Sequence, residues 1–158
     1  MAEETVKVSP MVIAQATPTP APVSAPARVS SAAPKFVLVV EDDVFLSSLL
    51  ISRLQQAGLT VQKATTGEEA LARLRGGTVP SLILLDIILP QKSGFEVLAE
   101  IQADPNLQKA PVIITSNLGQ EGDMQRGKQL GAVGYFVKAQ TPIEDLVAKV
   151  KEIVDGKA

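Results

Sequence analysis

The sequence predicts an α/β fold in which five parallel strands form one open, doubly wound sheet with helices on both faces. Short apolar runs rich in β-branched residues alternate five times with segments whose apolar residues recur at helical spacing. The strand candidates are almost wholly apolar, which is typical of strands buried on both faces of a parallel sheet. Because crossovers between parallel strands are right-handed, we expect an open sheet with its working site beyond the carboxyl ends of the strands.

The first strand and helix are predicted at "FVLVV", residues 36–40, and "VFLSSLLISRLQQAG", residues 44–58. The strand run is short and wholly apolar. Gly58 is predicted to end the helix, since glycine is favoured just past a helix C-terminus. The apolar residues that recur at helical spacing in this segment are Phe45, Leu46, Leu49, Leu50 and Leu54.

The second and third strands are predicted at residues 59–64 and 81–86, on either side of a second helix. Thr66 and Glu69 have the spacing of a capping box, in which a hydroxyl and a carboxylate bind free N–H groups at a helix start. This pattern predicts a helix that begins after Thr66 and runs through Arg75, where a Gly-Gly pair ends it.

The capping pattern recurs at Ser93 and Glu96, which predicts a third helix that extends to about residue 103. The apolar run of residues 110–116 is predicted to be the fourth strand. Residues 120–132 are predicted to contain the helix that follows it.

The fifth strand is predicted at residues 133–138, ahead of a last helix that runs through Val154. Thr141, Pro142 and Glu144 are predicted to supply its N-cap, a proline at the first helical position and a capping carboxylate.

Residues 1–34 differ in composition from the rest of the chain. They contain six prolines among Ala, Ser, Thr and Val and have no helical or strand period. We expect a disordered Pro/Ala-rich tail, either a simple spacer or a tether or docking segment, followed by one folded domain over residues 35–156. The chain has no secretory signal and no apolar run of membrane-spanning length, so we expect a cytoplasmic protein with no membrane partner.

Composition excludes several kinds of chemistry. The chain has no cysteine and no histidine, which rules out disulfides, thiolate nucleophiles, Ser-His dyads and the usual transition-metal ligands. A net charge of −2 argues against nucleic acid as a partner. Any chemistry therefore depends on Asp, Glu, Lys, Ser and Thr, with a metal that prefers oxygen.

Charged and hydroxyl side chains follow the predicted strands at the edge where the carboxyl ends meet. Clustered carboxylates repel one another unless a cation neutralises them. Oxygen-only ligands suit Mg²⁺ or Mn²⁺, and a lysine beside them suits a phosphoryl group. The residues are Glu41, Asp42 and Asp43 after the first strand, Asp86 at the third, Thr115 and Ser116 at the fourth, and Lys138 at the fifth.

From about Lys35 to Asp155 the chain closely resembles the receiver domain of two-component response regulators. The resemblance rests on the acidic pair after "VLVV", the Asp before "IILPQKSGFEVL", the hydroxyl after "PVIIT" and the lysine in "GYFVK". The spacings from Asp42 to Asp86, on to Ser116 and on to Lys138 are 44, 30 and 22 positions. The resemblance implies a flavodoxin-like fold with strand order 2-1-3-4-5.

The resemblance also implies a role for each matching position. The implied reaction is attack by a carboxylate on the phosphohistidine of a histidine kinase or phosphotransfer protein, giving an acyl phosphate. Self-phosphorylation and autodephosphorylation are the only enzymatic activities implied. The implied roles are Asp86 as phosphoacceptor, Glu41, Asp42, Asp86 and the Ile88 backbone carbonyl as Mg²⁺ or Mn²⁺ ligands, Lys138 as the motif lysine, and Ser116 and Tyr135 as switch residues.

Some positions have a structural alternative. Asp86 alone would also suit a cap after a strand, and Asp43 is expected to cap the first helix rather than bind metal. A register slip of one residue would exchange Thr115 and Ser116, because strand side chains alternate between faces. Tyr135 could be a half-buried core residue.

Three further positions bear on the geometry of the site. Gly94 is expected to serve the backbone near the start of the third helix. Ala139 follows the lysine where the family usually has proline, often in a cis bond, so we expect a trans loop. Asn117 stands where a small residue is common, and its amide could slow access to the site or position water there.

The leading hypothesis is a single-domain response regulator that accepts a phosphoryl group on Asp86 and switches a protein-interaction face. Only four residues follow the last predicted helix, so output is expected through an unknown downstream protein that contacts the last two helices and the strand between them. One alternative is a receiver-like scaffold that works without phosphorylation. A haloacid-dehalogenase-like phosphatase would need a second Asp two positions after Asp86, where the chain has Ile88.

Overall fold

The computed structural model describes residues 35–77, 79–117 and 119–156, and it confirms the predicted sheet. All four pairs of neighbouring strands are parallel, in the order β3-β2-β4-β5-β6, which is 2-1-3-4-5 when the strands are counted along the chain. The predicted disordered tail, residues 1–34, lies outside the described residues. The strands are β2 (Phe36–Val40), β3 (Thr60–Ala64), β4 (Leu82–Asp86), β5 (Val112–Ser116) and β6 (Gly134–Val137).

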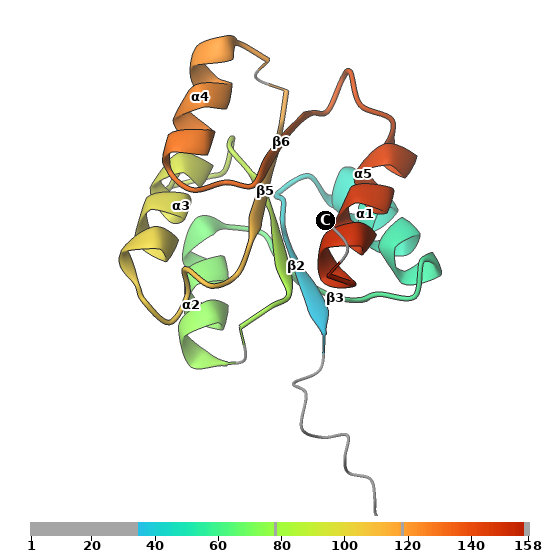
Figure 1. The fold of residues 1–158 in the computed structure, drawn as a ribbon, viewed down its shortest axis with the longest axis horizontal. Coiled ribbons are helices and arrows are strands. Elements are labelled where there is room, and N and C mark those ends of the chain that lie inside the picture. Colours follow the sequence, from blue (N-terminus) through green and yellow to red (C-terminus); the bar gives the residue numbers. More distant parts are fainter. Residues whose placement is uncertain (1–34, 78, 118, 157–158) are drawn as a thin grey trace, which may run out of the picture. The chain divides into compact units, whose positions relative to one another are not determined.

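Helices cover both faces of this sheet, as the alternation of elements predicts. In Figure 1, α2, α3 and α4 lie on one side of the strands and α1 and α5 on the other. Alternate strand residues enter different cores: Val37 and Val39 pack in the α1/α5 layer, and Leu38 and Val40 in the opposite layer. The helices are α1 (Val44–Gln56), α2 (Gly67–Gly76), α3 (Gly94–Ala103), α4 (Glu121–Gln129) and α5 (Ile143–Val154).

The helix starts agree with the sequence in part. The capping box of Ser93 and Glu96 is complete. Thr66 caps α2 as predicted, but the Glu69 carboxylate accepts from the N–H and hydroxyl of Thr65, so the second half of the box differs. Thr65 donates two hydrogen bonds to this carboxylate, from its N–H and its hydroxyl, so the carboxylate binds Thr65 and not the N–H of Thr66.

The predicted start of α5 is wrong by one residue. Pro142, and not Thr141, is the N-cap, because its ψ of 143° is extended. Its carbonyl accepts the first helical hydrogen bonds, from the N–H groups of Asp145 and Leu146. Proline fixes only φ, and a φ of −59° fits both helical and extended backbone.

Helix α4 is the most polar of the helices and has only one buried residue, Gly127. A Cβ at this position would lie 2.5 Å from Cδ1 of Ile114 and 3.4 Å from the Tyr135 ring. The missing side chain therefore lets the helix backbone approach β5 and β6. Among the described residues, no helix combines the length and the apolar character that a bilayer span requires.

Candidate functional site

The carboxyl ends of four neighbouring strands bring the predicted site residues to one edge of the sheet. Asp86 and Ser116 are the last residues of β4 and β5, and Glu41 and Lys138 directly follow β2 and β6. Strand pairing continues into these positions, since the Lys138 N–H donates to the Ser116 carbonyl at 2.8 Å. The backbone of the site is therefore held by the rigid part of the fold.

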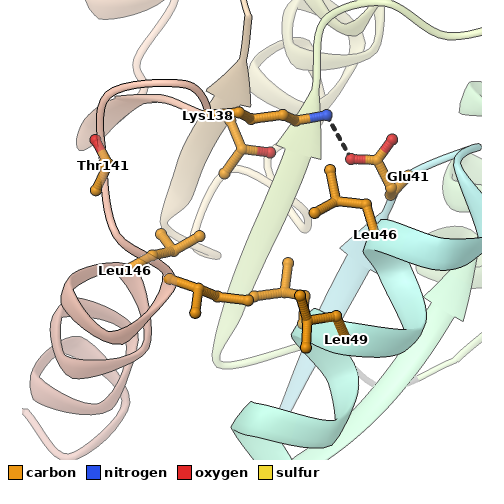
Figure 2. Close-up of a pocket in the computed structure, with 9 residues that line it drawn as sticks. Glu41, Leu46, Leu49, Lys138, Thr141 and Leu146 are labelled. Carbon is orange, nitrogen blue, oxygen red and sulfur yellow. Dashed lines mark hydrogen bonds and ion pairs between the residues drawn. The ribbon is translucent and has the colours of Figure 1, made fainter.

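Lys138 joins two buried carboxylates. Its Nζ lies 2.5 Å from Oε2 of Glu41 and 3.1 Å from Oδ2 of Asp86, and those acidic side chains are 4% and 5% exposed. Figure 2 shows the ammonium pointing at the Glu41 carboxylate. Buried carboxylates this close together are costly unless a cation lies between them, so Lys138 is needed for both.

Four acidic residues, Glu41, Asp42, Asp43 and Asp86, line an open pocket of about 240 Å³. One oxygen from each of Glu41, Asp42 and Asp86 lies within 4.8 Å of the others, and Ile88 forms part of the same wall. Because the chain has no histidine or cysteine, the side chains described here could bind a metal ion only through oxygen atoms. Such a set fits a hard divalent cation such as Mg²⁺ or Mn²⁺.

The charges of this cluster are strongly coupled. Burial raises the pKa of Glu41 to about 7, the hydrogen bond with Lys138 opposes that rise, and the neighbouring Asp86 adds to it. Burial alone would lower the pKa of Lys138, but its contacts with Glu41 and Asp86 outweigh burial and raise that pKa. Lys138 therefore keeps its positive charge beside the acceptor candidate.

The hydroxyl positions divide between the two faces of β5. Ser116 is completely buried and shares its face with Ile114, whereas Thr115 is paired in register with Asp86. Burial raises the pKa of Tyr135, and its hydrogen bond with the Ser116 side chain lowers it in part. Ser116 thus lies next to Tyr135, and Asn117, not Ser116, lines the acidic pocket.

The alternatives for the acidic residues are partly settled by local hydrogen bonds. Asp43 caps α1, because its Oδ1 accepts from the N–H of Leu46 at 2.9 Å. Asp86 also has a local contact, from the N–H of Ile88 to Oδ1 at 3.2 Å. A cap alone would not require the contact with Lys138, so Asp86 has both a turn role and a place in the ionic cluster.

Sequence reasoning missed one apolar side of the site. Leu46, considered only as a member of the helical pattern, lines the acidic pocket. Phe45 belongs to the same pattern but is 80% exposed, because it lies in the first turn of α1 beside the end of β2. Helical spacing identifies a helix but does not show which residues of its first turn lie beyond the core.

Gly94 is required by the loop that holds Asp86. A Cβ at this position would overlap the Asp86 carbonyl oxygen and lie 2.8 Å from Cα of Ile87. The N–H of Gly94 also donates to the Ile87 carbonyl at 2.8 Å. The sequence expectation that Gly94 serves the backbone is confirmed. The peptide bond before Ala139 is trans, also as expected.

We expect Gly94→Ala to destabilise the fold by about 2–4 kcal/mol, because the overlap is with backbone atoms that have no rotamer to change. Urea unfolding measures the effect. Gly122→Ala is the matched control: nothing lies within 4 Å of its Cβ position in α4. The control should stabilise by up to about 1 kcal/mol. Equal effects of the two substitutions would contradict the close approach at Gly94.

Residues 37–151 match the family model of the response regulator receiver domain. The phosphate regulon transcriptional regulatory protein PhoB of Rhizobium meliloti (strain 1021) is 36% identical over 119 residues, which cover 75% of this chain and 51% of that protein. The chain spans about half the length of the curated relatives it matches first.

Two solved structures are similar in fold and carry relevant ligands or modifications. The Mn²⁺-bound form of response regulator Rcp1 has a TM-score of 0.67 and 32% identity, and the match covers 78% of this chain and 94% of that one. The phosphorylated cyanobacterial phytochrome response regulator RcpA has a TM-score of 0.69 and 32% identity, with 80% and 97% covered.

Proposed function

Because this chain belongs to the response regulator receiver domain family, we propose that residues 35–156 accept a phosphoryl group on Asp86. The observation that best supports this proposal is the position of the Asp86 carboxylate. It is buried, contacts Lys138 and lies beside two further acidic side chains. Receiver domains interact with histidine kinases or phosphotransfer proteins, and a phosphohistidine of such a partner is the proposed donor. The phosphorylated form of the similar protein RcpA supports phosphorylation of this fold.

Glu41, Asp42 and Asp86 would hold one Mg²⁺, with the backbone carbonyl of Ile88 as a further ligand. Mn²⁺ would suit the same oxygen donors. The metal would supply positive charge that offsets the repulsion between the acidic side chains and the incoming phosphoryl group. The Mn²⁺-bound form of the similar protein Rcp1 supports the assignment.

The chain's own residues bring the acceptor to the phosphorus atom and stabilise the product. One carboxylate oxygen of Asp86 forms a bond to phosphorus, and the bond between phosphorus and the donor imidazole breaks with its electron pair going to nitrogen. Lys138 lies 3.1 Å from the Asp86 carboxylate and would offset charge on the phosphoryl oxygens. Release of the group to water restores the carboxylate.

We infer that Ser116 and Tyr135 transmit this change. Ser116 would have to turn toward the phosphoryl group, and that movement would alter its hydrogen bond with Tyr135. Tyr135 lies in β6, and its ring is 3.4 Å from where a Cβ of Gly127 would be. It is therefore next to the point at which the α4 backbone approaches the sheet. A switch at this point would alter the face formed by α4, β6 and α5, where an unknown downstream protein would bind. The single-domain form, the cytoplasmic location and the absence of a nucleic-acid partner stay predictions.

The direct test is phosphoryl uptake from acetyl phosphate with Mg²⁺, followed by intact-mass measurement. We expect one added phosphoryl group per chain, labile to base, and none when EDTA removes the metal. Peptide mapping should place the group on Asp86. A stable adduct at a serine or threonine, or uptake that is unaffected by EDTA, would contradict the proposed chemistry.

Mg²⁺ affinity is expected to depend on pH. Glu41 keeps its proton up to a pKa of about 7 in the metal-free fold, and a metal must displace that proton. Affinity should therefore rise up to about tenfold per pH unit below 7 and level off above it. Metal-free stability should fall as the pH rises from 4.5 toward 7, because the unfolded carboxyl has already lost the proton that the folded one retains.

Calorimetric titration of Mg²⁺ at several pH values measures this dependence. Glu41→Gln is the control, since it should weaken binding at pH 8 and remove the step near 7. A wild-type affinity that does not change across this range would contradict the displacement of a Glu41 proton by the metal.

A further inference from the structure

A second cavity lies behind the acidic pocket, between α1 and α5. It measures about 170 Å³ and has the Lys138–Glu41 ion pair at one end (Figure 2). Figure 2 shows Leu46 and Leu49 reaching into it from α1 and Leu146 from α5. The walls are mainly aliphatic, formed by Leu46, Leu49, Leu50, Ile143 and Leu146.

Thr115 places an unpartnered hydroxyl on the wall of this cavity. The side chain is 5% exposed and shares its strand face with Ile113, which belongs to the α1/α5 core. Among the described residues it has no hydrogen-bond partner. A buried hydroxyl without a partner costs about 1–3 kcal/mol, so one at the wall of a cavity indicates a missing partner inside it.

The walls limit what can enter. A cavity of about 150 Å³ with aliphatic walls is large enough for one benzene-sized molecule. An ion of either sign would lose its hydration against five aliphatic side chains, and the charges at the Lys138–Glu41 end are already paired with each other. A neutral molecule with an apolar body and one hydroxyl fits both the walls and Thr115.

We propose that this α1/α5 cavity is a binding site for a small neutral hydroxyl-bearing molecule of about the size of phenol, with Thr115 as its hydrogen-bond partner. The site is separate from the acidic pocket, but Glu41, Leu46 and Lys138 line both. A molecule bound here therefore touches the lysine that holds Asp86. Binding at the two cavities is then linked, and each occupant must change the affinity of the other equally.

The test is an NMR titration of the full chain with methyl-labelled Leu, Ile and Val, without metal or phosphodonor. The result therefore does not depend on the proposed phosphoryl transfer. With phenol we expect saturable shifts confined to the methyl groups of the cavity walls. Toluene, which has the same shape without the hydroxyl, should bind about five- to tenfold more weakly, and benzoate should not bind.

Two substitutions locate the site. Thr115→Val keeps the shape and should lower phenol affinity about five- to tenfold while leaving toluene unchanged. Leu49→Trp fills the cavity from its partly exposed rim and should abolish both. Unchanged methyl signals in the opposite layer, from Leu71 and Leu98, show that each variant folds.

Three results would overturn the proposal: equal affinity for phenol and toluene, phenol binding that Thr115→Val leaves unchanged, or shifts that do not saturate. Each would mean that the cavity holds water only or that the probe binds elsewhere. If Leu49→Trp fails to fold, Leu46→Phe fills the same space from the neighbouring turn of α1.

Discussion

Replacing Asp86 by asparagine is expected to abolish phosphoryl uptake and leave the fold intact. The amide oxygen carries no full charge and is a poor nucleophile, so uptake should fall by about three orders of magnitude or more. The local structure should survive, because the amide oxygen can still accept from the Ile88 N–H. Lys138 also keeps its contact with Glu41. Loss of the Asp86 charge should also relieve its repulsion with the neighbouring Glu41 carboxylate.

The measurement is intact mass after incubation with acetyl phosphate and Mg²⁺, with circular dichroism melting to show that the variant is folded. Asp43→Ser is the matched control, since it removes a charge from the same rim and keeps an oxygen that can cap α1. The control should take up phosphate at close to the wild-type rate. Uptake retained by Asp86→Asn, or lost equally in both variants, would remove Asp86 from the acceptor role.

Replacing Lys138 by methionine is expected to cost about 3–5 kcal/mol of stability at pH 8 and to impair phosphoryl uptake. The reason is that Glu41 and Asp86 would then face each other without the cation that lies 2.5 Å and 3.1 Å from them. The loss should shrink at acid pH, because each carboxyl can then be neutral. Urea unfolding at pH 5 and pH 8 measures both values.

Two further measurements separate lost charge from lost packing. Adding Glu41→Gln to Lys138→Met should restore much of the stability, and Mg²⁺ should stabilise the single variant more than the wild type. Lys151→Met is the control, since among the residues that the structure describes this lysine pairs only with Asp155, at the surface, and its loss should change stability by less than about 1 kcal/mol. A loss that is the same at both pH values and with the second substitution would mean that Lys138 acts through packing.

The strands could be predicted because the information is local and repeated, whereas their order followed from the resemblance to receiver domains. Buried strands are apolar throughout, and a parallel sheet brings their carboxyl ends together, so the approach of Asp86 to Lys138 follows from topology. The α1 cap at Asp43 could also be predicted, since it needs only a carboxylate three residues before a free N–H. The strands and the cap depend on spacing along one element, and the approach of Asp86 to Lys138 depends on the parallel arrangement of the strands.

The features that could not be predicted depend on which of several near-equal local contacts forms. Glu69 binds Thr65 instead of closing the box at Thr66, and ψ at Pro142 decides where α5 begins. In each case the observed contact and the predicted one are one residue apart, and their free energies differ little. The place of Thr115 beside a cavity is a different case, because it requires side chains from α1, α5 and β5 to be known together.

The low burial of α4, in which only Gly127 is buried, has a consequence for hydrogen exchange. A helix with little buried apolar surface opens at low free-energy cost, whereas α3 would have to expose five buried residues to do so. The amides of α4 should therefore be the first helical amides to exchange with deuterium, well before global unfolding. Such local opening lets a small free-energy change near Tyr135 alter the population of an entire helix without loosening the sheet that supports the site.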